Sequence, residues 1–439
     1  MRQRITPEQL TSALNESALA DANAFLDKSV ADLKAIKPAW REFCQEKSDI
    51  AIESWTFFFR QWVQLHRKGY PSVEQPYLAL LDRNMVEIKM VYLAFFRLHS
   101  GLIYELRNTQ PAMFIWLMLS TEFEHEPKHL LAALSLTDRL SEDEVSLLLL
   151  HAKHTHLDIT LALLIEGNTV IKDRVFNALT RRQTLSVGLA KHWLKTGILS
   201  EEQVHPVLAR FDVEASIEWV KDANMDEAYL FELLLCKHDR ATWFRQRFGI
   251  DQAALDSAPL STYAKLLELA EFQHFEPDAG MAPVQMALSG RPDWAQTALA
   301  HIVSLDESEG EEWLFALFVI YGDGFPLSPQ ALGIEYSWEE ALAVIEQWRD
   351  QGLDHLTRPT RLGELLTFDS TLNAMNHTGI PERYRVWLWR QICIHGRVYI
   401  PWHWTMPVNQ QQWLFSKLPQ QVAVIERFNL RNQNATLGY

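Results

Sequence analysis

Cysteine is scarce in this chain: Cys44, Cys236 and Cys393 are the three among 439 residues, and they are widely spaced. The N-terminus also lacks the basic region and following apolar stretch that make a secretory signal. Both features favour a reducing compartment, so we expect the protein to act in the cytoplasm.

Long apolar runs are missing as well. The strongest one, residues 112–120, is too short to cross a bilayer, and the run over 86–104 contains charged residues such as Glu87, Lys89 and Arg97. The sequence therefore predicts no transmembrane segment and no membrane insertion.

Basic residues are fewer than acidic ones: 41 against 56, which gives a formal net charge of -15. A surface of this sign repels nucleic-acid phosphates and anionic lipid headgroups. Nucleic-acid binding by a helical repeat is therefore only the second alternative function. A glycine-rich phosphate loop and a G-x-S-x-G nucleophile elbow are also missing, which removes two common enzyme signatures.

What the chain does contain is enough apolar sequence for a large core. Hydrophobic residues make up 48% of it and charged residues 22%, an ordinary globular balance. A length of 439 residues exceeds what one compact core supports, so two domains or an elongated array are expected.

Apolar residues recur along most of the chain at the three- and four-residue steps of an α-helix. The N-terminal part should open with a helix after Thr6, capped by Thr6 and Gln9 and running to about residue 33, followed by helices over 51–67 and 86–106. Shorter amphipathic helices follow at 130–140, 142–153, 157–166, 170–179, 184–196, 201–211, 228–238, 241–248, 263–272, 294–304 and 311–321.

Short connections between these helices carry start and stop signals. Ser141 with Glu144 and Ser200 with Gln203 fit capping boxes, and Gly167 and Gly197 fit helix ends. The two glycines are thirty residues apart (197 minus 167), which is one helix pair per repeat. We therefore predict an all-α protein, an α-solenoid of stacked helix pairs, and such arrays usually bind other proteins.

The composition suggests three parts. Residues 1–110 form an aromatic-rich N-terminal helical region, residues 111–325 the helical repeats, and residues 326–439 a C-terminal helical cap rich in tryptophan. In the last part, Ser337 with Glu340 should start one helix and another should run over 382–393, whereas the prolines within 398–407 exclude a regular helix there.

One resemblance adds to this pattern. A tryptophan-bearing helix (338–348), the Leu-Thr-Arg-Pro-Thr-Arg-Leu-Gly segment (356–363), a short helix ending near Gly379, an arginine-rich helix with Arg383, Arg385 and Arg390, and a glutamine-containing stretch (410–414) follow one another in order. This part resembles a bacterial family of HEAT-like repeat proteins encoded beside type VI secretion loci. The resemblance covers residues 336–416, the first hundred residues depart from it, and it implies an accessory or adaptor protein of a secretion apparatus.

The main enzyme alternative rests on His125-Glu126-Pro127-Lys128-His129, a literal H-E-x-x-H. In zinc hydrolases this spacing places two imidazoles one helical turn apart on the metal. Pro127 would break that helix at its centre. We therefore expect a helix that begins at Pro127, and zinc-dependent hydrolysis is kept as the first alternative.

Other reactive residue types are also present. His151, His154 and His156 could bind zinc, but such a group at a helix end is more often solvated. Cys236 before His238, and Cys393 with His395, are adjacent in sequence, which seldom produces a catalytic pair, so Cys236 is interpreted as a buried apolar residue.

Candidate partner-binding residues come from two groups. Arg174, Arg181 and Arg182 could line one ridge of the array and steer a charged partner. Trp387, Trp402 and Trp404 belong to a residue type that is enriched at binding hot spots, although such rings also pack the closing cap of a repeat array. We predict a non-catalytic scaffold or adaptor, without a metal or other cofactor, that binds other proteins.

Overall fold

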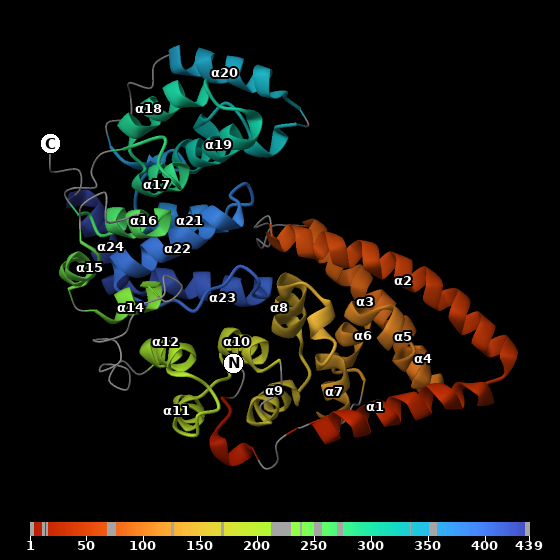
Figure 1. Cartoon of the computed structure of the whole chain (residues 1–439). Helices are drawn as coiled ribbons and strands as arrows, with labels where there is room; N and C mark the ends of the chain where they lie inside the picture. Colours follow the sequence, from red (N-terminus) through yellow and green to blue (C-terminus); the bar gives the residue numbers. More distant parts are fainter. Residues whose placement is uncertain are drawn as a thin grey trace. The chain divides into compact units, whose positions relative to one another are not determined.

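The computed structural model describes residues 4–10, 14, 16–67, 76–123, 127–167, 171–211, 230–237, 239–249, 257–269, 275–333, 335–350 and 358–434. These residues form an all-helical protein with a single two-stranded hairpin among them, which confirms the predicted all-α class (Figure 1). No helix in these ranges is both long enough and apolar enough to span a bilayer.

The chain divides into two compact units. Unit 1 consists of residues 1–66, 75–216 and 405–407, and unit 2 consists of residues 67–74, 217–404 and 408–439. The predicted boundaries near residues 110 and 325 lie inside these units, and the three-part division stays a prediction.

Unit 1 contains the N-terminal helices and the first part of the expected repeats. Its helices are η1 (Pro7–Gln9), α1 (Glu16–Ala31), η2 (Asp32–Ala35), α2 (Pro38–Arg67), α3 (Pro76–Leu98), α4 (Gly101–Tyr104), α5 (Leu106–Thr109), α6 (Pro111–Met118), α7 (Pro127–Leu134), η3 (Thr137–Arg139), α8 (Glu142–His151), α9 (Leu157–Glu166), α10 (Lys172–Arg182), α11 (Val187–Lys195) and α12 (Glu201–Phe211).

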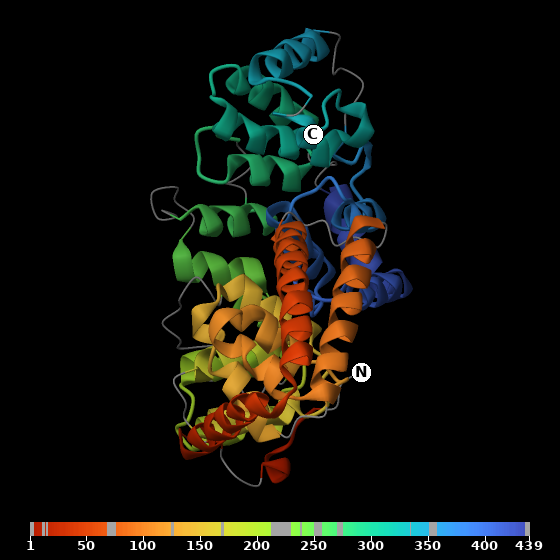
Figure 2. The same ribbon diagram turned by 90° about the vertical axis from the view of Figure 1, so that its right-hand side faces the viewer.

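Helix α2 packs through the aromatic face that its sequence spacing predicts. Trp55, Phe59 and Trp62 are buried. The Trp55 ring lies 5.7 Å from Trp116 of α6, between ring centroids. Helix α3 runs alongside α2, and the hydroxyl oxygens of Ser48 and Tyr92 are 2.8 Å apart (Figure 2).

Several of the shorter helices of unit 1 follow the predicted starts and stops, whereas α7 ends at Leu134 and not at residue 140, and α10 ends at Arg182 and not at residue 179. Ser141 and Glu144 cap α8 reciprocally, and Gln203 accepts the backbone N–H of Ser200 before α12. Gly197 follows α11 with a φ of 72°, the left-handed conformation that suits glycine at a helix end. Neighbouring helices are in contact in the pairs α6–α7, α7–α9, α8–α10, α9–α10 and α11–α12.

Unit 2 contains the later helices and the tryptophan-rich segment. Its elements are α14 (Leu230–Cys236), α15 (Arg240–Phe248), α16 (Ala258–Leu266), α17 (Ala282–Ser289), α18 (Pro292–Ile302), α19 (Glu307–Tyr321), η7 (Gly322–Gly324), η8 (Pro329–Ala331), α20 (Trp338–Asp350), β1 (Thr360–Arg361), β2 (Glu364–Leu365), α21 (Phe368–Asn376), α22 (Glu382–Gly396), α23 (Val408–Lys417), η9 (Leu418–Gln420) and α24 (Val422–Asn434).

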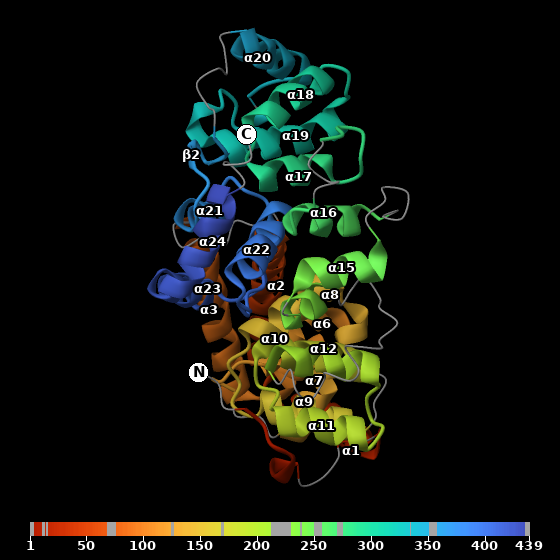
Figure 3. The same cartoon turned by 90° about the vertical axis from the view of Figure 1, so that its left-hand side faces the viewer.

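The core of unit 2 joins elements that are distant in sequence. Figure 3 shows α17, α18, α19 and α20 stacked on one another. Helix α22 packs against α14, α16, α17 and α24. The buried guanidinium of Arg361 connects α17 and α22 by hydrogen bonds. It donates to the carbonyl oxygens of Ala287 and Leu288 and to Gln391 Oε1.

Several local expectations need correction. The predicted N-terminal helix is two pieces, because the 3-10 turn η1 ends at Gln9 and α1 begins at Glu16. The helix expected over 86–106 ends at Leu98, and α4 and α5 continue as single turns. Helix α17 and the β1–β2 hairpin, with Thr360 opposite Leu365, were not expected. Both are short and depend on packing from residues far along the chain, so periodicity does not reveal them.

A close helix contact in unit 2 leads to the first prediction. A Cβ on Gly310 of α19 would lie 2.0 Å from the ring of Trp338, and the Trp338 indole N–H is bonded to the carbonyl of Leu305 at 3.1 Å. Helix propensity alone would make Gly310→Ala stabilising, yet the ring cannot move without losing that bond. We expect Gly310→Ala to lower the free energy of unfolding by about 1–3 kcal/mol.

The matched control is Gly188→Ala in α11, where an added Cβ meets nothing closer than 3.9 Å. This change should be neutral or stabilise the fold by up to about 1 kcal/mol. Urea titration monitored by circular dichroism compares the two variants. Equal effects from both would contradict the contact between Gly310 and Trp338.

Candidate functional site

The strongest candidate surface for a partner is a groove between α8 and α10 in unit 1. Two of the predicted residues, Arg174 and Arg181, line it. Its enclosed volume is about 20 Å³, room for one water, so it is a shallow groove and not a ligand cavity. The full lining is Glu142, Val145, Ser146, Leu149, Leu150, Arg174, Asn177, Ala178 and Arg181, called below the α8–α10 groove.

Arg174 and Arg181 are seven residues apart on α10, which places them on the same helix face about 10 Å apart. Arg174 is exposed and Arg181 is partly exposed. Arg174 Nη1 donates to the carbonyl oxygen of Thr137 at 2.7 Å, and Arg181 Nη1 donates to Ser146 Oγ at 2.7 Å. These bonds hold the guanidinium groups at two places along an apolar floor formed by Leu149 and Ala178.

Arg182 has a different role from the adjacent Arg181. Its side chain is buried and forms an ion pair with Asp158 of α9, through Nε to Oδ1 and through Nη2 to Oδ2 at 3.0 Å. Nη1 donates to the carbonyl oxygens of Leu149 and Ala152 at the end of α8. Arg182 therefore connects α8, α9 and α10 inside unit 1, and it does not contribute to the surface.

Two of the three predicted tryptophans are also buried. Trp387 packs on Tyr263, with ring centroids 5.1 Å apart, and under the guanidinium of Arg390 at 4.5 Å. The Trp402 indole N–H donates to Gln411 Oε1 at 2.9 Å. Trp404 is partly exposed and stacks on His403. Burial thus removes Arg182, Trp387 and Trp402 from the surface, and the binding prediction stays with Arg174, Arg181 and Trp404.

Only part of the H-E-x-x-H segment of the zinc alternative lies within the described residues. Helix α7 begins at Pro127 as predicted, whereas His125 and Glu126 are not among the described residues. His129 is buried, and its ring stacks on Phe25 with centroids 4.3 Å apart. The described residues contain no group of three histidine, cysteine or acidic side chains placed to hold a metal ion.

The second histidine group is likewise divided among structural contacts. His151 Nε2 lies 3.1 Å from the carbonyl oxygen of Thr405. His154 Nδ1 accepts the backbone N–H of His156 at 3.2 Å, and burial, with the neighbouring His156, lowers the pKa of His154. Each ring thus has a local role at the end of α8 or before α9.

The cysteines show no activated thiol among the side chains that the structure describes. Burial raises the pKa of the Cys393 thiol to about 12, so it stays protonated at neutral pH. The Cys236 side chain and His238 lie outside the described residues, and the interpretation of Cys236 as a buried apolar residue stays a prediction.

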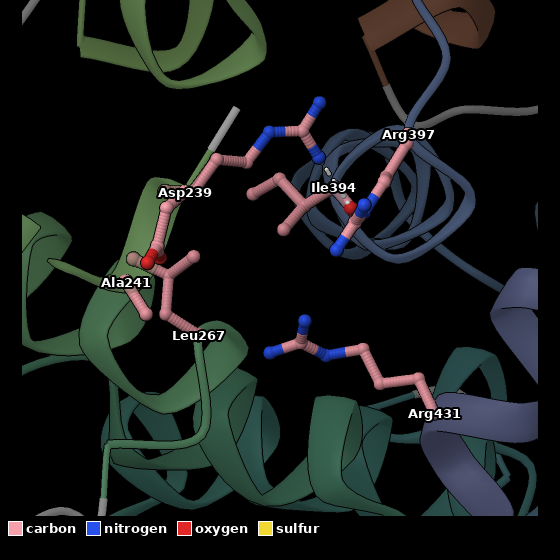
Figure 4. Close-up of a pocket in the computed structure, with 7 residues that line it drawn as sticks. Asp239, Ala241, Leu267, Ile394, Arg397 and Arg431 are labelled. Carbon is pink, nitrogen blue, oxygen red and sulfur yellow. Dashed lines mark hydrogen bonds between the residues drawn. The ribbon is translucent and has the colours of Figure 1, made fainter. Parts of the chain in front are cut away.

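A second site, in unit 2, was not predicted. Three arginines from different elements, Arg240 at the start of α15, Arg397 after α22 and Arg431 on α24, line one cavity of about 320 Å³ (Figure 4). The other lining residues are Asp239, Ala241, Leu267 and Ile394. This space is called below the arginine cavity. Its three arginines are far apart in the sequence, and no local spacing connects them.

No known protein family, curated protein or solved structure matches this chain. The resemblance of residues 336–416 to HEAT-like proteins of secretion loci therefore stays a prediction.

Proposed function

We propose that this protein is a non-catalytic helical-repeat scaffold that binds another protein through the α8–α10 groove. The observation that carries this proposal is the order of helix contacts. In unit 1, α7 packs on α9 and α8 packs on α10, so in both pairs a helix contacts the second helix after it in the sequence. In unit 2, α17 packs on α19 and α18 on α20. Repeated contacts of this kind are typical of stacked helix pairs in α-solenoids.

The chemistry of the groove supports an acidic partner segment. Arg174 and Arg181 outnumber the single carboxylate of the groove lining, that of Glu142, in a chain whose formal net charge is -15. The groove is therefore a locally positive part of an acidic protein and attracts acidic groups. The apolar side chains of Leu149 and Ala178 line the same groove. We expect a partner helix or strand with two carboxylates about 10 Å apart and an apolar residue between them.

The origin of the partner is proposed from the resemblance alone. The order of motifs over residues 336–416 supports an accessory role beside a bacterial type VI secretion apparatus in the cytoplasm. Affinity purification from the native host, with identification of the co-purifying proteins, tests this part. If no secretion component is recovered, the assignment to that apparatus is lost while the scaffold proposal can still stand.

The groove itself is tested by reversing its charges. The variant Arg174→Glu/Arg181→Glu should retain the fold, because both side chains are at the surface, and should capture the partner at least about 10-fold less well. The measurement is quantitative mass spectrometry of proteins retained by the tagged chain at low and at high salt.

The matched control is Arg97→Glu, which reverses an exposed charge on α3 in the same unit. It should capture the same proteins as the unmodified chain. Equal capture by the double variant and the control would show that the groove does not bind the partner.

A further inference from the structure

The arginine cavity carries more positive than negative charge, even when Glu268, whose Oε2 lies 3.5 Å from Arg431 Nε, is counted beside the lining. Its lining holds three arginines and a single carboxylate, that of Asp239. This carboxylate is already engaged as the N-cap of α15, where it accepts the backbone N–H of Thr242 at 3.1 Å and the Thr242 hydroxyl at 2.7 Å. Figure 4 shows it on the side of the cavity away from Arg397 and Arg431.

Two of the arginines are held in place by backbone carbonyls. Arg240 Nη1 donates to the carbonyl oxygen of Ile394 at 2.6 Å, at the C-terminal end of α22. Arg431 Nη2 donates to the carbonyl oxygen of Leu266 at 3.2 Å, and its Nε lies 3.5 Å from Glu268 Oε2. A guanidinium has five N–H donors, so a positioned arginine can still bind a ligand.

Arg397 differs from both, because its exposed side chain has no hydrogen bond or ion pair with any residue that the structure describes. Its backbone has φ 52° and ψ 50°, the left-handed conformation at the end of α22. Glycine takes this conformation at helix ends without strain, whereas a residue with a Cβ is disfavoured there. Strained positions of this kind cluster at functional sites.

The Arg397 and Arg431 side chains both point into the space beside Leu267 (Figure 4). Burial lowers the pKa of Arg431, Glu268 acts against this shift, and the positive charge of Arg397 lowers the pKa further. The two guanidinium groups therefore repel each other. An anion between them would remove this repulsion and could accept charge-assisted hydrogen bonds from both.

The dimensions and walls limit the class of ligand. A volume of about 320 Å³ is at the lower end of the range for small-molecule sites. Leu267 and Ile394 supply apolar surface beside the charged groups. We infer that the arginine cavity binds a small organic oxyanion, a phosphate monoester or a carboxylate, between Arg397 and Arg431, independently of the protein partner proposed for unit 1.

Isothermal titration calorimetry of the full chain in chloride buffer tests this inference. The probes are phenyl phosphate and benzoate, which share an aromatic ring and differ in the charged group, together with inorganic phosphate. Saturable binding of phenyl phosphate assigns a phosphate ester, and binding of benzoate alone assigns a carboxylate. If none of the three probes binds above the chloride background, the inference is wrong.

Arg397→Gly separates binding from folding. Glycine removes the guanidinium and relieves the left-handed strain, so we expect a melting temperature at least equal to that of the unmodified chain and an affinity reduced about 10- to 100-fold. The control, Arg349→Ala, removes an exposed arginine of α20 in the same unit and should bind as the unmodified chain does. Unchanged affinity in Arg397→Gly would overturn the assignment of this residue.

Discussion

Replacing Arg182 by methionine is expected to lower the free energy of unfolding by about 3–5 kcal/mol. The change leaves Asp158 without its ion-pair partner and leaves the carbonyl oxygens of Leu149 and Ala152 without their donor. The Asp158 side chain is only 16% exposed, so water can restore little of what is lost. Methionine is long and apolar enough to fill the space, so the measured loss would come from the polar contacts and not from a cavity.

The neighbouring residue provides the control. Arg181→Met removes the same chemical group one position earlier in α10, where the side chain is partly exposed and bonds Ser146. We expect a change within about 1 kcal/mol, because a surface contact contributes little. Chemical denaturation followed by near-ultraviolet absorbance or circular dichroism measures both variants, and similar losses from the two would show that Arg182 does not tie the three helices together.

Asp158→Asn extends this test to the pair itself. In the double variant Arg182→Met/Asp158→Asn the unpaired buried charge is gone, so the loss should be smaller than the sum of the two single losses. A double-mutant cycle that gives simple additivity would contradict a direct interaction between the two side chains.

Acid should destabilise unit 2 through His395. This ring is buried, its Nε2 lies 2.8 Å from the carbonyl oxygen of Leu266, and Asn432 Nδ2 lies 3.3 Å from its Nδ1. A carbonyl only accepts, so Nε2 carries the proton and Nδ1 accepts the amide. Burial, with added repulsion from Arg431 and Arg240, lowers the pKa of His395 to about 3, so the ring stays neutral in the folded protein.

The sign of the pH effect follows from this lowered pKa. In the unfolded chain the imidazole takes up a proton near its ordinary pKa of 6.5, while the folded protein does not until about 3. The unfolded state therefore binds more protons between these values, and the free energy of unfolding falls as the pH falls. Between about pH 7 and about pH 4.5, His395 should account for a loss of about 3 kcal/mol.

His395→Gln isolates this contribution. Glutamine does not titrate and can still donate to the carbonyl of Leu266, so the variant should lose less stability in acid than the unmodified chain. Taking the difference between the two proteins at each pH cancels the acidic residues that titrate in the same range. If the free energies of unfolding of the two proteins fall by the same amount from neutral to acidic pH, His395 is not held neutral by the fold.

Local signals in the sequence predicted much of the secondary structure of unit 1. The bounds of α9 and α12 agree with the predicted helices over 157–166 and 201–211. The capping pair of Ser141 and Glu144 forms as expected. Helix caps and apolar periodicity involve residues within one or two turns of each other. They can therefore be recognised in the sequence without knowledge of tertiary contacts.

The arginines of α10 show where this local information ends. The sequence placed Arg174, Arg181 and Arg182 in one group, because all three are basic and could line one ridge of the array. The predicted helix ended at residue 179, whereas α10 continues to Arg182 and carries all three. Successive residues of a helix point about 100° apart, so Arg181 and Arg182 face different surroundings. Which of those surroundings is buried depends on α8 and α9, and only their packing placed Arg182 inside.

The arginine cavity depends even more on long-range contacts. Arg240, Arg397 and Arg431 meet because α15, the end of α22 and α24 pack around one space. No spacing in the sequence marks these residues, and the acidic net charge of the chain disfavoured nucleic acids and anionic lipids as partners. A net charge averages over the whole surface, whereas a ligand responds to the few charges within its own contact distance.

By itself, then, the amino-acid sequence determined that the protein is all-helical and where along the chain most of its shorter helices lie. Hydrophobic period and capping act within a few residues, and they leave a readable pattern. The tertiary structure alone decided which arginines and tryptophans are buried, which stay at the α8–α10 groove, and which three arginines share a cavity. Those outcomes depend on contacts between helices tens to hundreds of residues apart, and the energy of such contacts is not carried by any one segment.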